Sequence, residues 1–341
     1  MAQQKKRWRW ISRWSIVRLA LVVALPSGAA YQCMIRMPGE SYRGELLPLA
    51  EHEQALRDEL ERDVRLLADE IGERNLYRPA ALRKAADAIA GALGAAGYAV
   101  EREVYRVGGA VCENVWAERA GTDAGSAAIV VGAHYDTVAG CPGANDNGTG
   151  VAAVLALARR FASRSVRSTI RFVAFVNEEP PYFQTEDMGS RVHARRSRER
   201  GDRIAGMLSL ETMGYYSDEE GSQAYPFPLG VFYPKRGDFI GFVGNLSSRR
   251  WVRRVIGLFR EHARFPSEGA ALPEKLPGVG WSDHWSFAQE GYPALMITDT
   301  APFRYPHYHE PTDTPEKIDF DRFARVVAGL ERVLVAIVEG S

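Results

Sequence analysis

The stretch Ala127–Gly150 reads AAIVVGAHYDTVAGCPGANDNGTG, and it decides the fold. It begins with an apolar run, Ile129–Val131, in which apolar and polar residues do not alternate. Such a run is typical of a strand that is buried on both faces. His134, Asp136 and Asp146 follow the run, and open α/β sheets bind their ligands at the carboxyl ends of their strands. The stretch therefore predicts a buried strand that leads into a ligand-binding loop.

Helices and strands alternate along the rest of the chain. Strands are expected at 100–107, 111–118, 127–132, 169–176, 205–210, 239–243 and 293–298, and helices at 51–72, 79–97, 150–161, 189–203, 249–262, 282–290 and 320–338. This order predicts an α/β fold, a three-layer αβα sandwich around a central, mostly parallel, mixed sheet. The segment 217–238 is long for a loop and rich in glycine, proline and aromatic residues, so we expect it to pack over a cleft.

The composition favours a globular protein without a bias toward charged partners. The 341 residues are 46% hydrophobic, which is enough for a sizeable core. Because the formal net charge is +0, no global charge points to nucleic acid. Nothing in the sequence indicates the oligomeric state.

The N-terminal residues 1–36 have the pattern of a targeting segment. Basic residues and tryptophans precede the apolar run Leu19–Leu25, and small residues extend to Ala30. This order is typical of a secretory signal peptide cleaved after Ala30. An uncleaved membrane anchor remains open, because the uncharged run Leu19–Ile35 reaches the lower limit of about 17–25 residues for a membrane span. Both interpretations predict export, to the periplasm or outside the cell, or attachment to the membrane.

The remaining chain divides into a linker and one large domain. Residues 37–50 are expected to form an extended linker that wraps onto the domain 51–341. The three cysteines are not at metal-site spacing. In an exported protein Cys112 and Cys141 could pair, since both lie near the opening loop, although two buried free thiols are slightly favoured.

Residues of the kinds that bind metals occur at four places, most of them after predicted strands. These are His134 with Asp146, Glu178 with Glu179, Glu211, and the loop Pro306–His309. Each alone would mean little, because single histidines and acidic pairs are common on surfaces. Their joint position after successive strands predicts one site, and imidazole nitrogens with carboxylate oxygens suit zinc.

The same residues give the chain a family resemblance. The six ordered motifs are GAHYD (132–136), GANDNGTG (143–150), FVNEEP (175–180), LETMG (210–214), SDH (282–284) and HYHEPTDT (307–314). In these motifs the chain resembles the co-catalytic di-zinc aminopeptidases, a metallopeptidase family that also contains glutaminyl cyclases and transferrin receptor-like ectodomains. The resemblance runs from about Glu53 to the C-terminus and implies a zinc-exopeptidase-like fold with peptide substrates.

The resemblance also implies a role for each residue of the site. Asp146 would bridge two zinc ions, with His134 and Glu211 completing one and Glu179 and His309 the other. Glu178 would be the general base, while Asp136 and Asp283 would be outer carboxylates, Asp136 behind the His134 ring. Many members have Asp in place of Glu211. The resemblance is therefore weaker evidence for occupancy of the zinc ion that Glu211 would bind. A cis peptide bond at Asp146-Asn147 is implied too.

The spacing His-x-x-x-Asp-Thr selects His309 rather than His307 as the ligand. Tyr308 stands beside it and could donate a hydrogen bond to the oxyanion of the substrate, although a packed aromatic side chain is the alternative.

The leading functional hypothesis is an exported zinc aminopeptidase. The alternatives are a glutaminyl cyclase-like acyltransferase with one zinc, and a non-catalytic binding ectodomain; a carboxypeptidase or dipeptidase would share the metal site. Six aromatic residues are candidates for an apolar substrate pocket that prefers large hydrophobic N-terminal residues: Tyr215, Tyr216, Phe232, Trp285, Tyr292 and Phe303. Arg304 either binds a substrate carboxylate or forms a surface salt bridge.

Overall fold

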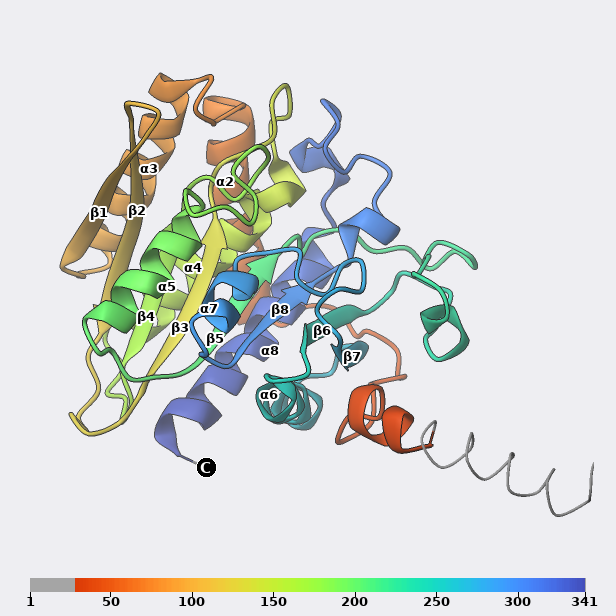
Figure 1. Cartoon of the computed structure of the whole chain (residues 1–341). Coiled ribbons are helices and arrows are strands. Elements are labelled where there is room, and N and C mark those ends of the chain that lie inside the picture. The colour runs from red at the N-terminus through yellow and green to blue at the C-terminus, as the bar shows by residue number, and fades with distance from the viewer. Residues whose placement is uncertain (1–27, 341) are drawn as a thin grey trace, which may run out of the picture.

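The computed structural model describes residues 28–340, and Figure 1 shows a sheet between two layers of helices. The strands are β1 (Val100–Val107), β2 (Ala110–Arg119), β3 (Ala128–His134), β4 (Ile170–Phe175), β5 (Ile204–Glu211), β6 (Ile240–Asn245), β7 (Ser267–Leu272) and β8 (Ala294–Thr298). They form one sheet in the order β1-β2-β4-β3-β5-β8-β6-β7. The pairs β1/β2, β2/β4 and β6/β8 are antiparallel and the other four are parallel, so the sheet is mixed as predicted.

The helices cover both faces of this sheet. They are α2 (Glu51–Arg65), α3 (Pro79–Ala95), α4 (Gly150–Phe161), α5 (Gly189–Glu199), α6 (Arg249–His262), α7 (His284–Gln289) and α8 (Phe320–Glu339), and the π-helical turn Leu66–Ile71 continues α2. On one face α3, α4 and α6 pack directly on the strands, with α2 and α8 packed against them. On the other face lie α5 and α7. The predicted three-layer αβα architecture is confirmed.

The opening stretch forms the central strand β3, and it is buried on both faces. Ile129 and Val131 point into the main core, which includes α4, whereas Val130 points into a second core with Phe175 and Phe287. An apolar run without alternation is the pattern that two-sided burial requires. Beside it, α4 is apolar nearly all round because the sheet lies on one side and other helices on the other.

The strand β7 is the one strand of the described sheet that the sequence pattern does not indicate. Its residues, SEGAAL, include no β-branched or aromatic side chain, and glycine and alanine are depleted in strands. β7 pairs with β6 along its whole length and forms the edge of the sheet. The pairing, rather than local propensity, accounts for this strand.

The N-terminal part of the described chain packs on the domain. Residues 37–50 contain no helix or strand, and Met37 and Leu49 are buried. Most of the predicted signal peptide or anchor, residues 1–36, lies outside the described residues. No helix within residues 28–340 has the length and apolar character needed to span a bilayer.

The cysteines of the domain are not paired. Cys112 and Cys141 are both buried free thiols, which is the alternative that the sequence slightly favours. The Cys141 thiol donates to the Glu310 carbonyl at 3.2 Å, and the Cys112 sulfur accepts a hydrogen bond from the Asn177 amide at 3.3 Å.

Candidate metal centre

The candidate ligands meet because four parallel strands end at the same edge of the sheet. β3 ends at His134 and β5 at Glu211. Glu178 and Glu179 follow β4, and the loop after β8 contains His309. Asp146 lies in the turn before α4, where the peptide bond to Asn147 is cis, as the resemblance implies.

Asp146 occupies the middle of the cluster, with each carboxylate oxygen facing a different histidine. Asp146 Oδ1 is 3.3 Å from His134 Nε2, which is 3.4 Å from Glu211 Oε2. Asp146 Oδ2 is 3.1 Å from His309 Nε2, which is 3.3 Å from Glu179 Oε2. The five side chains therefore form two groups of three donor atoms that share one carboxylate.

The distances from each histidine to its two carboxylates fit zinc, and His134, Asp146 and Glu179 have ligand atoms that all lie within 4.8 Å of one another. Zinc bonds of about 2.0–2.1 Å at tetrahedral angles place neighbouring donors about 3.3–3.4 Å apart, close to the separations between these side chains. His309 Nε2 and Glu179 Oε1 are buried and have no hydrogen-bond partner among the described residues, although carboxylate oxygens of Asp146 and Glu179 lie near His309 Nε2. Buried polar atoms that lack a hydrogen-bond partner are rare in folded proteins, and a bound cation would supply the missing partner.

The electrostatics of the cluster also favour a cation. Burial raises the pKa of Glu178 well above its usual value and that of Glu179 to about 7. Burial opposes ionisation of Asp146 as well, but the nearby imidazoles of His134 and His309 outweigh it and lower the pKa of this carboxyl. Burial disfavours the charged form of His309, yet Asp146 and Glu179 raise its pKa to about 10. Without metal, the carboxyl groups of the cluster outnumber the two imidazoles that could balance their negative charge.

Asp136 supports both sides of this arrangement. Its two oxygens accept hydrogen bonds from the backbone N–H groups of Glu178 and Glu179, at 3.1 and 3.2 Å. The oxygen bonded to Glu178 also lies 3.5 Å from His134 Nδ1. Asp136 thus holds the turn after β4 and stands behind the His134 ring.

The other residues selected from the sequence lie at defined places around the centre. A carboxylate oxygen of Glu178 is 3.9 Å from His134 Nε2, farther away than the closest ligand atoms. Tyr308 stacks on the His309 ring with 3.9 Å between centroids. His307 is turned away and lies 2.8 Å from the Thr312 hydroxyl. Asp283 is fully buried, its carboxylate oxygens have no hydrogen-bond partner among the described residues, and burial raises its pKa to about 7.

Two residues that organise the loop around Asp146 were missed by sequence reasoning. Arg74 is completely buried and donates to the carbonyl groups of five residues: Leu67, Gly72, Tyr135, Pro142 and Gly143. Asp313 accepts from the backbone N–H groups of Asn145 and Asp146, at 2.9 and 3.0 Å. Asp313 lies in the motif that identifies His309, so that motif contains a signal for it. A single arginine in a turn gives none.

An apolar pocket of about 100 Å³ adjoins the centre. Glu211 and Tyr308 belong to both, and the segment 217–238 covers part of it through Tyr225 and Tyr233, as expected. Of the six aromatic residues proposed for such a pocket, only Phe303 lines it. The other five do not line this pocket, because the way the loops fold over β6 and β7 determines which aromatic rings face it.

Arg304 has neither of the two predicted roles. It is buried, with its guanidinium bonded to Gln223 Oε1 at 2.7 Å and to the Phe239 carbonyl at 2.8 Å. These bonds fasten the segment 217–238, here called the covering loop, to the residue before β6. Arg304 is therefore part of the framework that holds the pocket. It forms no surface salt bridge, and it is not among the residues that line the pocket.

Comparison with known sequences identifies relatives over most of the chain. A model of peptidase family M28 matches residues 114–333. The uncharacterized protein YfbL of Escherichia coli (strain K12) is 35% identical over 286 residues, which cover 81% of this chain and 87% of that protein. Leucine aminopeptidase 1 of Arthroderma otae is 25% identical over 221 residues, which cover 59% of this chain. The match covers 52% of that aminopeptidase, so the chain spans about half its length.

Solved structures share the fold at low sequence identity. A zinc aminopeptidase from Bacillus subtilis has a TM-score of 0.66 and 15% identity, over 87% of this chain and 97% of that one. A glutaminyl cyclase of Fimbriiglobus ruber has a TM-score of 0.62 and 20% identity over the same shares. These likenesses establish the architecture alone.

Proposed function

The chain belongs to peptidase family M28, and from this premise we propose that it is a zinc-dependent aminopeptidase that releases N-terminal residues from peptides. The observation behind the proposal is the arrangement about Asp146, whose two oxygens each face one histidine. In this proposal His134 and Glu211 hold one zinc ion, and Glu179 and His309 hold the other. Asp146 is shared between the two.

The remaining residues have roles that follow from their positions. Bound zinc would polarise the scissile carbonyl and make a water molecule more acidic. Glu178 adjoins the ligand Glu179 but lies outside the closest donor set, so it can take a proton from water and deliver it to the leaving amine. The Tyr308 hydroxyl donates a hydrogen bond to the oxygen of the scissile carbonyl.

The pocket supports cleavage at an N-terminal residue. Glu211 and Tyr308 line both the pocket and the centre, so a side chain in the pocket belongs to the residue whose carbonyl lies at the centre. The buried carboxylates around it would attract the α-ammonium group of a free N-terminus. An N-terminal residue presents both groups together.

The role of Glu178 can be tested with Glu178→Gln. The amide cannot accept the proton, so kcat for aminoacyl amides should fall by about 10²–10⁴-fold, while zinc content and KM change little. The measurements are steady-state kinetics and elemental analysis of the purified full chain.

The matched control is Glu186→Gln, which changes a solvent-exposed glutamate a short distance along the chain. This variant should keep wild-type activity. A Glu178→Gln enzyme with more than one tenth of the wild-type kcat would disprove the assignment of the base.

Metal and product analysis separates the alternatives. Two zinc ions per chain and free N-terminal amino acids as products support the proposal. One zinc ion with pyroglutamate formed from N-terminal glutamine would identify a glutaminyl cyclase-like acyltransferase. A protein that retains no zinc and binds peptides without turnover would be a binding ectodomain.

We also propose that the protein acts outside the cytoplasm. The basis is the order of basic, apolar and small residues in the N-terminal segment. The described chain begins next to the covering loop, where the Tyr31 and Phe232 rings lie 5.8 Å apart. Cell fractionation with N-terminal sequencing of the mature chain would separate a cleaved signal peptide from an anchor, and a cytoplasmic protein with an intact N-terminus would exclude both.

A further inference from the structure

Four large apolar side chains, here called the apolar patch, lie on the outside of the covering loop and beside the start of the described chain. Phe227 is 93% exposed, Val231 79% and Phe232 47%. The fourth, Tyr31, is 42% exposed and reaches the loop from the N-terminal segment, with its ring 5.8 Å from that of Phe232. Single apolar side chains are common on protein surfaces, but a group of large ones marks an interaction surface.

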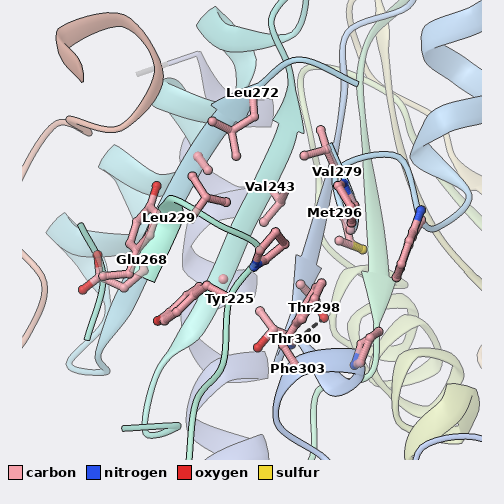
Figure 2. Close-up of a pocket in the computed structure, with 18 of the residues that line it drawn as sticks. Tyr225, Leu229, Val243, Glu268, Leu272, Val279, Met296, Thr298, Thr300 and Phe303 are labelled. Carbon is pink, nitrogen blue, oxygen red and sulfur yellow. Dashed lines mark hydrogen bonds between the residues drawn. The ribbon is translucent and has the colours of Figure 1, made fainter. Parts of the chain in front are cut away.

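The fold of the covering loop keeps the patch on the outside. At the short 3₁₀ turn Leu229–Val231, the Leu229 side chain packs against an apolar cluster that contains Leu272. Figure 2 shows Leu229 in the pocket, together with Tyr225 of the same loop. The Phe232 backbone N–H donates to the Leu229 carbonyl at 2.9 Å and closes the turn. Because Leu229 occupies the inner side of the turn, its exposed neighbours have no place in the core of the domain.

The first described residues connect the patch to α6. Residues 28–34 are helical, and Met34 and Ile35 pack against the same apolar cluster as the covering loop. The Arg36 carbonyl accepts a hydrogen bond from the Arg253 guanidinium of α6. In Figure 1 the start of the described chain, drawn in red, accordingly lies between α6 and the covering loop. The patch, this short helix and α6 therefore share one side of the molecule.

Positive charge without a counter-charge accompanies the patch on this side. Four arginines in the first two turns of α6 form no ion pair within residues 28–340: Arg249, Arg250, Arg253 and Arg254. On α5, by contrast, Arg191 and Arg195 both pair with Glu186. Basic residues next to an apolar surface attract the anionic headgroups of phospholipids.

The sequence that leads into the described chain has a composition that suits the same partner. The uncharged run Leu19–Ile35 includes Tyr31 itself, and basic residues and tryptophans precede this run. Even a fully extended chain spans at most roughly 20 Å from Leu25 to Tyr31. A bilayer that takes up the apolar residues before Leu25 is therefore within reach of the patch. Cleavage after Ala30 would leave all four residues of the patch in the mature chain.

We propose that this side of the domain docks on the surface of a phospholipid bilayer with anionic headgroups. The apolar patch enters the interface, where aromatic side chains are favoured, and the α6 arginines approach the headgroup phosphates. A second copy of the chain fits this surface less well, because a symmetric contact brings two sets of α6 arginines together. The docking surface is independent of the peptidase activity proposed above.

Tryptophan fluorescence can locate the patch relative to a bilayer. The full chain carrying Phe227→Trp is reconstituted with vesicles of brominated phosphatidylcholine, with or without phosphatidylglycerol, since bromine quenches tryptophans that contact the acyl chains. The control Val104→Trp adds a tryptophan at a 51% exposed position of β1, which lies at the opposite edge of the sheet from β7. The wild type supplies the background from its own seven tryptophans.

In vesicles with phosphatidylglycerol, the tryptophan added by Phe227→Trp should be quenched and that added by Val104→Trp should not. Adding Arg250→Gln and Arg254→Gln to the first variant should lower the ratio of docked to free patches roughly 30-fold, because each arginine near an anionic surface contributes about a factor of 5. The matched pair Arg195→Gln and Arg198→Gln removes the same charge from α5, on the other face of the sheet, and should leave the quenching unchanged.

Quenching of Phe227→Trp that is absent, that equals the quenching of Val104→Trp, or that is the same without phosphatidylglycerol would overturn the inference. Emission that depends on the ratio of protein to lipid but not on bromine would identify a second copy of the chain as the occupant and would overturn it as well. No step requires hydrolysis. A chain without peptidase activity can therefore still confirm the docking surface, and an active peptidase can still fail to dock.

Discussion

Asp146 is the residue on which the candidate centre depends most. Its two oxygens face different histidines, and its backbone N–H is held by the Asp313 carboxylate. Glu211 contacts only the His134 side of the cluster, where Ser282 donates a hydrogen bond to the same oxygen that approaches the imidazole. The two carboxylates should therefore differ in how many metal ions depend on them.

This difference can be measured as zinc stoichiometry. Asp146→Asn removes the negative charge that both sites share, and one of its two oxygens becomes an NH₂ group with no lone pair for a metal, so the chain should lose both zinc ions after dialysis. Glu211→Gln should lower the affinity for one ion and retain about one zinc per chain, a loss of roughly 10–100-fold or more at that position. Elemental analysis of the dialysed variants checks both. Retention of two ions by Asp146→Asn would show that this carboxylate does not bridge.

Much of the site at this scale follows from the sequence, because the candidate ligands come directly after strands or in compact motifs. His134 and Glu211 are themselves the last residues of β3 and β5. Arg74 and Glu268, which lines the pocket, could not be found in this way. Their positions depend on contacts between distant segments, as in the bond from Arg74 to the Gly143 carbonyl.

At the scale of elements, the start of α4 is fixed against the end of β5. The Asn147 side chain accepts from the N–H groups of Gly150 and Thr212 and donates to the Leu210 carbonyl. A Cβ on Gly150 would lie 2.3 Å from that carbonyl oxygen, which is closer than real Cβ atoms come. The close contact of this helix with the strand end therefore depends on glycine.

A pair of glycine-to-alanine variants tests this contact. Gly150→Ala should destabilise the fold by about 1–3 kcal/mol because backbone atoms must move. Gly91→Ala, on the exposed face of α3 where a Cβ meets nothing within 4 Å, should instead stabilise the protein by up to about 1 kcal/mol through helix propensity. Urea unfolding of both variants in EDTA, followed by circular dichroism, removes any contribution from zinc. Equal stability of the two variants would contradict the proposed packing.

The elements themselves differ in how well the sequence predicts them. α4 and α6 begin and end where the pattern places them, because their apolar residues recur with the helical period over several turns. β7 has no comparable pattern, and its place in the sheet comes from pairing with β6. The pocket follows β7, since Glu268, Ala270 and Leu272 all line it. Because the sequence pattern does not predict β7, it does not predict the pocket residues on that strand either.

At the scale of the whole molecule, the candidate centre joins segments that are far apart in the chain. His134 and His309 approach the same carboxylate from different strand ends, and Glu179 and Glu211 come from two more. Bound metal would connect these segments directly. A ligand that binds only the folded state stabilises it by mass action.

Removal of metal should therefore lower the melting temperature. Free zinc at 100 times its Kd stabilises a protein by about 2.7 kcal/mol per site. For a domain of this size each kcal/mol corresponds to roughly 2–4 °C, so EDTA should lower the Tm by at least about 5 °C. Zinc added in excess should restore it, whereas Asp146→Asn should respond to neither reagent. Differential scanning calorimetry measures the shift, and an identical Tm with and without EDTA would argue against structural coupling.

The length of the pocket and the charge at its far end depend on different features of the strands β5, β8, β6 and β7. One row of paired residues crosses these strands: Glu211, Thr298, Gly241 and Glu268. The length of this row is set by backbone hydrogen bonds, so altering it would require a shift of a whole strand. The charge at the far end depends on one side chain at the edge of the sheet. A substitution at position 268 would therefore change the charge at this end of the pocket, while the length of the row stays the same.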